Sequence, residues 1–241
     1  MTNATGAMLV IGDEILSGRT RDINANVLAI ELTAKGIDLE EVRFVPDDKD
    51  RIIGALNSLR SDYTHVFTSG GIGPTHDDIT ADCVAAAFGV GIDVRGDARE
   101  ILERYYQEKQ IEMNEARLRM ARIPDTADLI DNPVSGAPGF SLGNVHVMAG
   151  VPKIFKGMLD GLLAGIASGQ AVESVTLRVE RPEGEVAAPL GEFANSHGDI
   201  SVGCYPFNEN GQLGCNIVLR GHDLDRLSAL LPELSGKLAK N

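Results

Sequence analysis

The densest group of residues able to do chemistry is the glycine-rich segment 69–73, with Asp77 and Asp78 close behind it. Glycines let the main chain pass close to a ligand and turn several N–H groups towards it. An apolar run at 65–68 precedes the segment and an alanine-rich helical pattern at 78–88 follows it, so a helix N-terminus adds partial positive charge. The spacing matches neither the dinucleotide fingerprint nor the Walker loop. We expect a phosphate cradle that uses Ser69, Gly70, Gly71 and Gly73; the alternative is a tight turn with an Asp helix cap.

Carboxylates lie beside this loop, where they would repel a phosphate unless a cation stood between them. Asp77 and Asp78 follow the glycines directly, and Asp13 and Glu14 follow another apolar run. Oxygen ligands of this kind suit a divalent cation such as Mg²⁺. We therefore expect Asp13, Glu14 and Asp78 to hold a metal. The alternative is that one Asp of the pair caps a helix while the other faces solvent.

Strand patterns at 8–11, 39–45 and 65–68 alternate with helical patterns at 23–32 and 50–59. This alternation predicts a parallel sheet with helices on its faces. The carboxyl ends of such strands meet at one edge, where open α/β sheets bind ligands. Asp47 and Asp48 form a third acidic pair, after the strand pattern at 39–45. Separately, each acidic pair is typical of a solvated turn, but three acidic pairs converging on one glycine loop favour a site.

Two loops rich in glycine and proline, 132–139 and 150–153, flank a strand or hairpin at 140–148 with a turn at Gly143-Asn144. The alternative for both loops is ordinary turn chemistry. For Asn24 and Asn26 the alternative is that they are ordinary residues at the start of a helix. Lys153 and Lys156 fit surface positions better than phosphate contacts. The further candidates for contacting the ligand are Asn24, Asn132, Gly136, Pro138, Gly139, Gly150 and Pro152.

A long polar helix is predicted over 98–122, ended by Pro124, and another helix over 152–163. Beyond a boundary near 167–170 the pattern becomes β-α-β-β-α, with a hairpin turn at 208–211. We therefore expect a three-layer α/β/α domain at 1–168 and a small α+β domain at 169–241.

The chain of 241 residues carries 22 basic and 35 acidic residues, a net charge of −13. An acidic protein repels a polyphosphate backbone, so we expect no nucleic-acid partner. No stretch approaches the roughly 18 apolar residues of a membrane span, and no signal peptide is visible. The cysteines, Cys83, Cys204 and Cys215, have no metal-binding spacing and fit a reducing, cytoplasmic location.

Segments 12–26, 69–80, 132–140 and 150–158, taken in this order, resemble the molybdopterin-binding domain of the competence/damage-inducible CinA family. The resemblance covers residues 7–165, and the tail is similar to the KH-like appendage of that family. Two departures stand out. Met148-Ala149-Gly150 replaces Leu-Pro-Gly, and 118–122 contains two arginines where the family tends towards Lys-Gln-Ala.

The resemblance implies a MoaB/Mog-like fold in which Asp47 and Asp78 support chemistry on a phosphate ester. It implies metal-dependent hydrolysis of a nucleotide pyrophosphate such as ADP-ribose or FAD, with Mg²⁺ or Co²⁺ and with K⁺ as a further candidate. It also implies a homo-oligomer, a dimer or a trimer. The chain matches a short form that lacks the nicotinamide-nucleotide deamidase domain, so deamidation is not expected. The alternatives are adenylyl or metal transfer in molybdenum cofactor biosynthesis, and a non-catalytic module that binds a nucleotide or a pterin phosphate.

Overall fold

The computed structural model describes residues 3–239. Contacts between Cα atoms divide the chain into two compact units, Met1–Gly169 and Gln170–Asn241. The boundary predicted from the sequence, between residues 168 and 169, lies one residue earlier. Among the described residues, no helix combines the length and the apolar character needed to cross a membrane.

The first unit is built on a six-stranded sheet of order β2-β1-β3-β8-β7-β6. Strands β2, β1, β3 and β8 run parallel, while β7 and β6 run antiparallel to their neighbours. The predicted turn at Gly143-Asn144 joins β7 to β8 as a hairpin. The parallel arrangement predicted for the first three strands is confirmed, and the hairpin adds antiparallel strands to it, because a tight turn can only reverse the chain. The strands are β1 (Ala4–Ile11), β2 (Ile37–Val45), β3 (His65–Ser69), β6 (Asp128–Ile130), β7 (Gly139–Leu142) and β8 (Val145–Met148).

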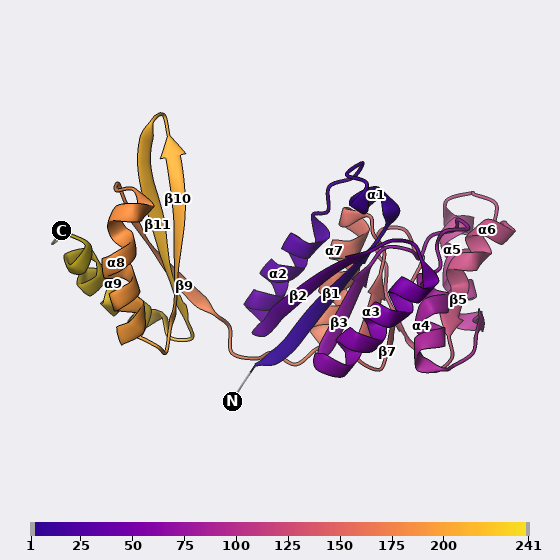
Figure 1. Ribbon diagram of the computed structural model, residues 1–241. Coiled ribbons are helices and arrows are strands. Elements are labelled where there is room, and N and C mark those ends of the chain that lie inside the picture. The colour runs from indigo at the N-terminus through magenta and orange to yellow at the C-terminus, as the bar shows by residue number, and fades with distance from the viewer. Residues whose placement is uncertain (1–2, 240–241) are drawn as a thin grey trace. The chain divides into compact units, whose positions relative to one another are not determined.

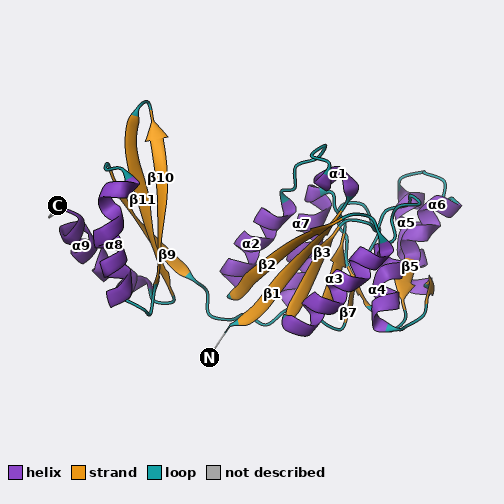
Figure 2. Ribbon diagram, viewed as in Figure 1, coloured by secondary structure: helices purple, strands orange, loops and turns teal. Residues whose placement is uncertain are grey.

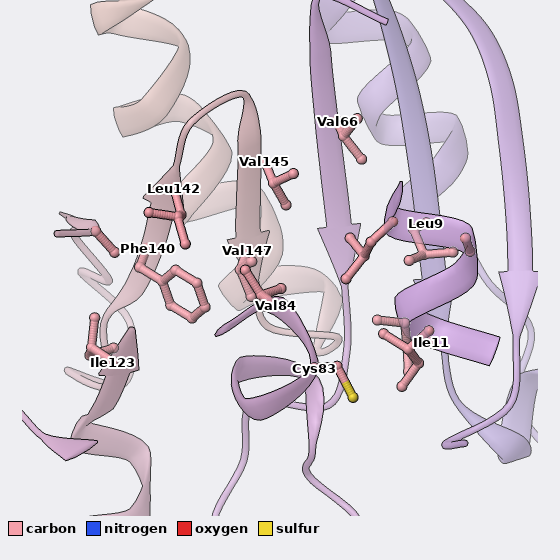
Figure 3. Packing of buried hydrophobic residues seen from close by; sticks show 14 of the residues in the cluster. Leu9, Ile11, Val66, Cys83, Val84, Ile123, Phe140, Leu142, Val145 and Val147 are labelled. Carbon is pink, nitrogen blue, oxygen red and sulfur yellow. The ribbon is translucent and has the colours of Figure 1, made fainter. Parts of the chain in front are cut away.

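Helices cover both faces of this sheet (Figure 1), as the three-layer prediction required. The side chains of β1 alternate between two buried clusters, Ala7, Leu9 and Ile11 in one and Met8 and Val10 in the other. Figure 3 shows part of the first cluster. Helices α3 (Lys49–Asp62) and α4 (Thr80–Phe88) contribute to the first cluster, and α2 (Asn24–Lys35) and α7 (Pro152–Gly165) to the second.

The predicted long helix over 98–122 is wrong. Helix α5 (Gly96–Glu108) ends before Gln110, which has a left-handed φ of 56°. The chain then forms the short helix α6 (Glu115–Leu118), a 3-10 turn η1 (Arg119–Ala121) and strand β5 (Arg122–Pro124). Strand β5 pairs with β4 (Ile92–Val94), which buries Ile123. The segment after α5 has too few apolar residues to bury a helical face, whereas the strand buries an isoleucine.

The second unit has the predicted β-α-β-β-α order (Figure 2). Its three antiparallel strands have the order β10-β11-β9, and Asn210 and Gly211 form the predicted turn with positive φ angles of 53° and 87°. Phe193, Ile217 and Leu234 are among its fully buried core residues. The elements are β9 (Glu173–Val179), α8 (Glu183–Ser196), β10 (Ser201–Glu209), β11 (Gln212–Gly221) and α9 (Leu224–Ala239).

Candidate functional site

The four parallel strands end at the same edge of the sheet, and the segment after each one borders a single cavity of about 540 Å³. Gly12 and Glu14 follow β1, Asp47 follows β2, the glycine loop follows β3 and Gly150 follows β8. Small-molecule sites typically have volumes of roughly 300–1,000 Å³. The cavity can therefore hold a ligand of nucleotide or pterin size.

The glycine loop, residues 70–73, needs glycine at its first two positions for steric reasons. Gly70 and Gly71 have φ angles of 107° and 70°. A Cβ atom at Gly70 would lie 2.2 Å from the carbonyl oxygen of Ile11, and one at Gly71 would lie 2.1 Å from Thr80 Oγ1. Thr80 Oγ1 donates to the Gly70 carbonyl at 3.0 Å, and the Thr80 N–H donates to the Gly71 carbonyl at 3.0 Å. The start of α4 thus holds the loop tightly.

The N–H groups of the glycine loop are available to a ligand. Gly71, Ile72 and Gly73 line the cavity, and within residues 3–239 no protein acceptor pairs with their N–H groups. Successive unpaired N–H groups beside a helix N-terminus form a concave site for an anion. This geometry fits the phosphate cradle predicted from the sequence.

Four carboxylates, those of Glu14, Asp47, Asp77 and Asp78, line the same cavity. Burial raises the pKa of Asp47 above its ordinary value. The hydrogen bond from the Asp13 N–H to Asp47 Oδ2, at 2.9 Å, lowers this pKa, while the charges of Asp13, Glu14 and Asp77 raise it. The ionised form of Asp47 is therefore disfavoured unless a positive charge is brought to the cavity.

The carboxylates do not converge into a complete metal cage. Over residues 3–239, no group of three or more His, Cys, Asp or Glu side chains is placed to hold a metal ion. Asp13 lies outside the large cavity and borders a separate surface hollow with Glu14. The three expected ligands, Asp13, Glu14 and Asp78, are thus not brought together as one set.

Asp78 does not cap the helix, so that interpretation of the sequence is wrong. Helix α4 begins at Thr80, with Ile79 at the cap position and no side-chain cap bond. Instead Asp78 Oδ2 accepts hydrogen bonds from the Thr75 N–H at 2.8 Å and from Thr75 Oγ1 at 2.5 Å. The bonds close a turn that presses the carboxylate against Gly73, where a Cβ atom would lie 2.7 Å from Oδ2.

Asn24 and Ser69 are buried and do not line the cavity. Asn24 Nδ2 donates to Ser69 Oγ at 2.8 Å and to the carbonyl oxygen of Gly150 at 2.7 Å. The structure therefore places both residues behind the loops rather than in front of a ligand.

The residues predicted in segment 132–140 do not all lie at the large cavity. Asn132 lines the cavity, but its side chain bonds within its own loop, to Ser135 and Ala137 among others. Gly136 packs against Tyr105, and Gly139 lies in β7 against Val147 and Met158. Pro138 borders a small adjacent cavity of about 20 Å³. The remaining predicted residues, Gly150 and Pro152, line the large cavity.

The apolar side of the cavity was not predicted. It is lined by Ile72 of the glycine loop, Met120 of η1, and Val151 and Ile154 at the start of α7. These three segments are distant in sequence, so no local pattern connects them. No Lys, Arg or His side chain from the described part of the chain lines the large cavity. Arg119 and Arg122 border the small adjacent cavity, which shares Gly71 and Gly73 with the large one.

Comparisons with known proteins agree with this geometry. Residues 7–168 match the family described as a probable molybdopterin binding domain, and residues 171–241 match the family described as FAD synthase, middle domain. A crystal structure of the protein CinA, of unknown function, from Thermoplasma acidophilum superimposes with a TM-score of 0.62. It is 32% identical and covers 68% of this chain and 99% of that one.

Two curated relatives extend the comparison. A CinA-like protein of Citrifermentans bemidjiense is 38% identical over 158 residues, which is 64% of this chain and 38% of the relative. A probable FAD synthase of Caenorhabditis elegans is 30% identical over 259 residues, which is 98% of this chain and 50% of the relative. This chain therefore spans half or less of those two proteins. By the match over residues 7–168 and by its likeness to CinA, the chain belongs to the CinA-like family of molybdopterin-binding-domain proteins.

Proposed function

We propose that this chain hydrolyses the pyrophosphate bond of a nucleotide such as ADP-ribose or FAD, with the help of a divalent metal. One observation carries the proposal: a loop of unpaired N–H groups and four carboxylates face the same cavity. The N–H groups suit the phosphates, whereas the carboxylates suit a cation and a water molecule. A site for binding a phosphate alone would gain nothing from carboxylates that repel it.

In this proposal the glycine loop binds the diphosphate. The N–H groups of Gly71, Ile72 and Gly73 would donate to its oxygens, and the α4 N-terminus adds partial positive charge. The side chains of Met120 and Ile154 offer an apolar surface to a base or another planar ring. The two kinds of lining thus match the two parts of a nucleotide.

Asp47 is the best placed general base. A base is most effective when its pKa lies near the working pH, and burial shifts the pKa of Asp47 in that direction. Asp47 would take a proton from the attacking water as the water oxygen bonds to one phosphorus and the P–O–P bond breaks. The departing phosphate keeps the bridging oxygen, and one product is AMP. Asp78, already bonded to Thr75, would orient groups near Gly73.

The residues present fit a divalent metal of the magnesium type. Mg²⁺ is usually held by one or two carboxylates together with substrate phosphates, not by a cage made of protein alone. Glu14 and Asp78 line the cavity and would supply such carboxylates. Bound Mg²⁺ or Co²⁺ would offset phosphate charge and lower the pKa of a coordinated water.

The test is AMP release from ADP-ribose and from FAD by the purified protein, with Mg²⁺, Co²⁺ or EDTA present. The proposal requires AMP that appears with metal and disappears with EDTA. It also requires that Asp47→Asn lower the release roughly a hundredfold or more. No AMP under any condition would refute the hydrolase.

A second candidate is binding of a pterin phosphate, as in molybdenum cofactor biosynthesis. The observation that favours it is the match of residues 7–168 to a probable molybdopterin binding domain. A pterin that co-purifies with the protein, seen by fluorescence after oxidation, would support this candidate. Tight nucleotide binding without AMP release would instead support a module with no turnover.

A further inference from the structure

We propose that Asn24 is a positioning residue that holds the glycine loop against the Gly150 loop, so that both walls of the cavity keep their places. The inference rests on the proposed function, since it assigns a role in that same site. Asn24 would not touch the ligand, because it is buried and lies outside the cavity lining. It would act through the two backbone segments that do line it.

The two hydrogen bonds of Asn24 join three distant parts of the chain. Its Nδ2 donates to Ser69 Oγ, 45 residues away, at 2.8 Å, and to the Gly150 carbonyl, 126 residues away, at 2.7 Å. Asn24 is itself fixed at the first position of α2, because the Asp22 carboxylate accepts from the N–H groups of Asn24 and Ala25. A held side chain thus connects two loops.

The two loops meet where the backbone ladder between β3 and β8 ends. The last paired residues are Ser69 and Met148, and the Gly70 N–H still donates to the Met148 carbonyl at 3.2 Å. A Cβ atom at Gly150 would lie 3.2 Å from Gly70 Cα, so the loops are in close contact. Asn24 extends the connection from the sheet to the first residues of the cavity wall.

The unpaired oxygen of the Asn24 side-chain amide favours a role in the site over a role in folding. Within residues 3–239, Asn24 Oδ1 is buried and has no hydrogen-bond partner. The reverse orientation is excluded, because it would point Oδ1 at the Gly150 carbonyl, which can only accept. A buried acceptor left unpaired destabilises the folded state. The amide is therefore a poor choice for stability, yet it supplies two donors where both loops need one.

Asn144 is a matched control at the opposite edge of the sheet. Its Nδ2 also donates two hydrogen bonds to backbone carbonyls of distant residues, Arg60 at 3.0 Å and Tyr63 at 2.9 Å. It does not line the cavity. Each of the two variants thus removes one side-chain amide that donates two hydrogen bonds. Asn24→Ala removes it beside the site, and Asn144→Ala removes it far from the site.

The experiment compares amide hydrogen exchange and ADP-ribose binding, with Mg²⁺ present, in the full chain and in both variants. For the binding measurement each protein also carries Asp47→Asn, so that little ADP-ribose is hydrolysed. We expect Asn24→Ala to speed exchange at residues 70–73 and 150–151. We also expect it to weaken ADP-ribose binding roughly tenfold to a hundredfold, because displaced loop N–H groups would lose hydrogen bonds to a charged phosphate. We expect Asn144→Ala to lower thermal stability at least as much while leaving binding unchanged. Ser69→Ala removes one of the two bonds, so it should give an intermediate result, and it replaces Asn24→Ala if that variant does not fold.

The inference would be overturned if amide exchange in both loops of Asn24→Ala were as slow as in the unmodified protein. Faster exchange with unchanged ADP-ribose affinity would also overturn it, because the connection would then have no effect on the site. If the unmodified protein does not bind ADP-ribose, the proposed function fails, and the exchange measurement alone decides the role of Asn24.

Discussion

Replacing Gly71 by alanine should damage both the folded state and the phosphate site, and Gly89 provides the control. Gly71 contacts the first residue of α4 and Gly89 follows its last, and both have nearly the same left-handed backbone, with φ angles of 70° and 67°. A Cβ atom at Gly89 would meet nothing within 4 Å, whereas one at Gly71 would lie 2.1 Å from Thr80 Oγ1. The pair therefore separates backbone strain from steric conflict.

The expected magnitudes follow from these two contributions. A left-handed alanine costs roughly 1–2 kcal/mol, and this should be the whole effect of Gly89→Ala. In Gly71→Ala the Thr80 hydroxyl must also move, which breaks its buried bond to the Gly70 carbonyl. Loss of that bond adds roughly 1–3 kcal/mol. We expect a total loss of roughly 2–5 kcal/mol in the free energy of unfolding for Gly71→Ala.

Urea denaturation measures the two losses, and AMP release from ADP-ribose with Mg²⁺ measures the site. Gly89→Ala should keep its activity, while Gly71→Ala should lose most of it even at temperatures where it is fully folded, because the loop N–H groups are displaced. Equal destabilisation of the two variants, with full activity in Gly71→Ala, would refute the steric argument and the cradle together.

Three further predictions concern ionisable side chains. Asp47→Asn should raise stability near neutral pH but not at low pH, because burial raises the pKa of Asp47 and so disfavours its ionised form in the folded state. The rate of AMP release should fall roughly a hundredfold or more. A variant that is fully active, or less stable near neutral pH, would contradict these expectations. Burial and the charge of His65 lower the pKa of His146 from 6.5 to about 4, so stability should fall by roughly 3 kcal/mol as pH falls through that window. His146→Phe should flatten the pH dependence of the free energy of unfolding, measured by urea denaturation at several pH values. An unchanged pH dependence would mean that other groups cause it. Arg119→Ala should weaken pyrophosphate binding in calorimetry roughly tenfold, because Arg119 borders a small cavity that shares Gly71 and Gly73 with the large one. The same loss in Arg99→Ala, a control on α5 paired with Glu103, would indicate a general charge effect.

Local patterns were sufficient for most of the elements. The apolar run at 8–11 predicted β1, and the helical patterns at 23–32, 50–59 and 152–163 predicted α2, α3 and α7. Asn210-Gly211 predicted the hairpin of the second unit. The pattern failed over 98–122, where polar residues with good helix propensity concealed the break at Gln110. Propensity is a weak guide when no apolar face has to be buried.

The sequence by itself determined that a glycine loop follows a buried strand and that acidic residues follow its neighbours, because strand order and loop chemistry are local properties. Only the tertiary structure decided which candidates face the cavity. Glu14, Asp47, Asp78 and Gly150 do, whereas Asn24 turns inward and Gly139 packs within the sheet. The direction of a side chain depends on residues up to 126 positions away, such as the partner of Asn24. A pattern of neighbours along the chain carries no information about such contacts, because folding alone brings them together.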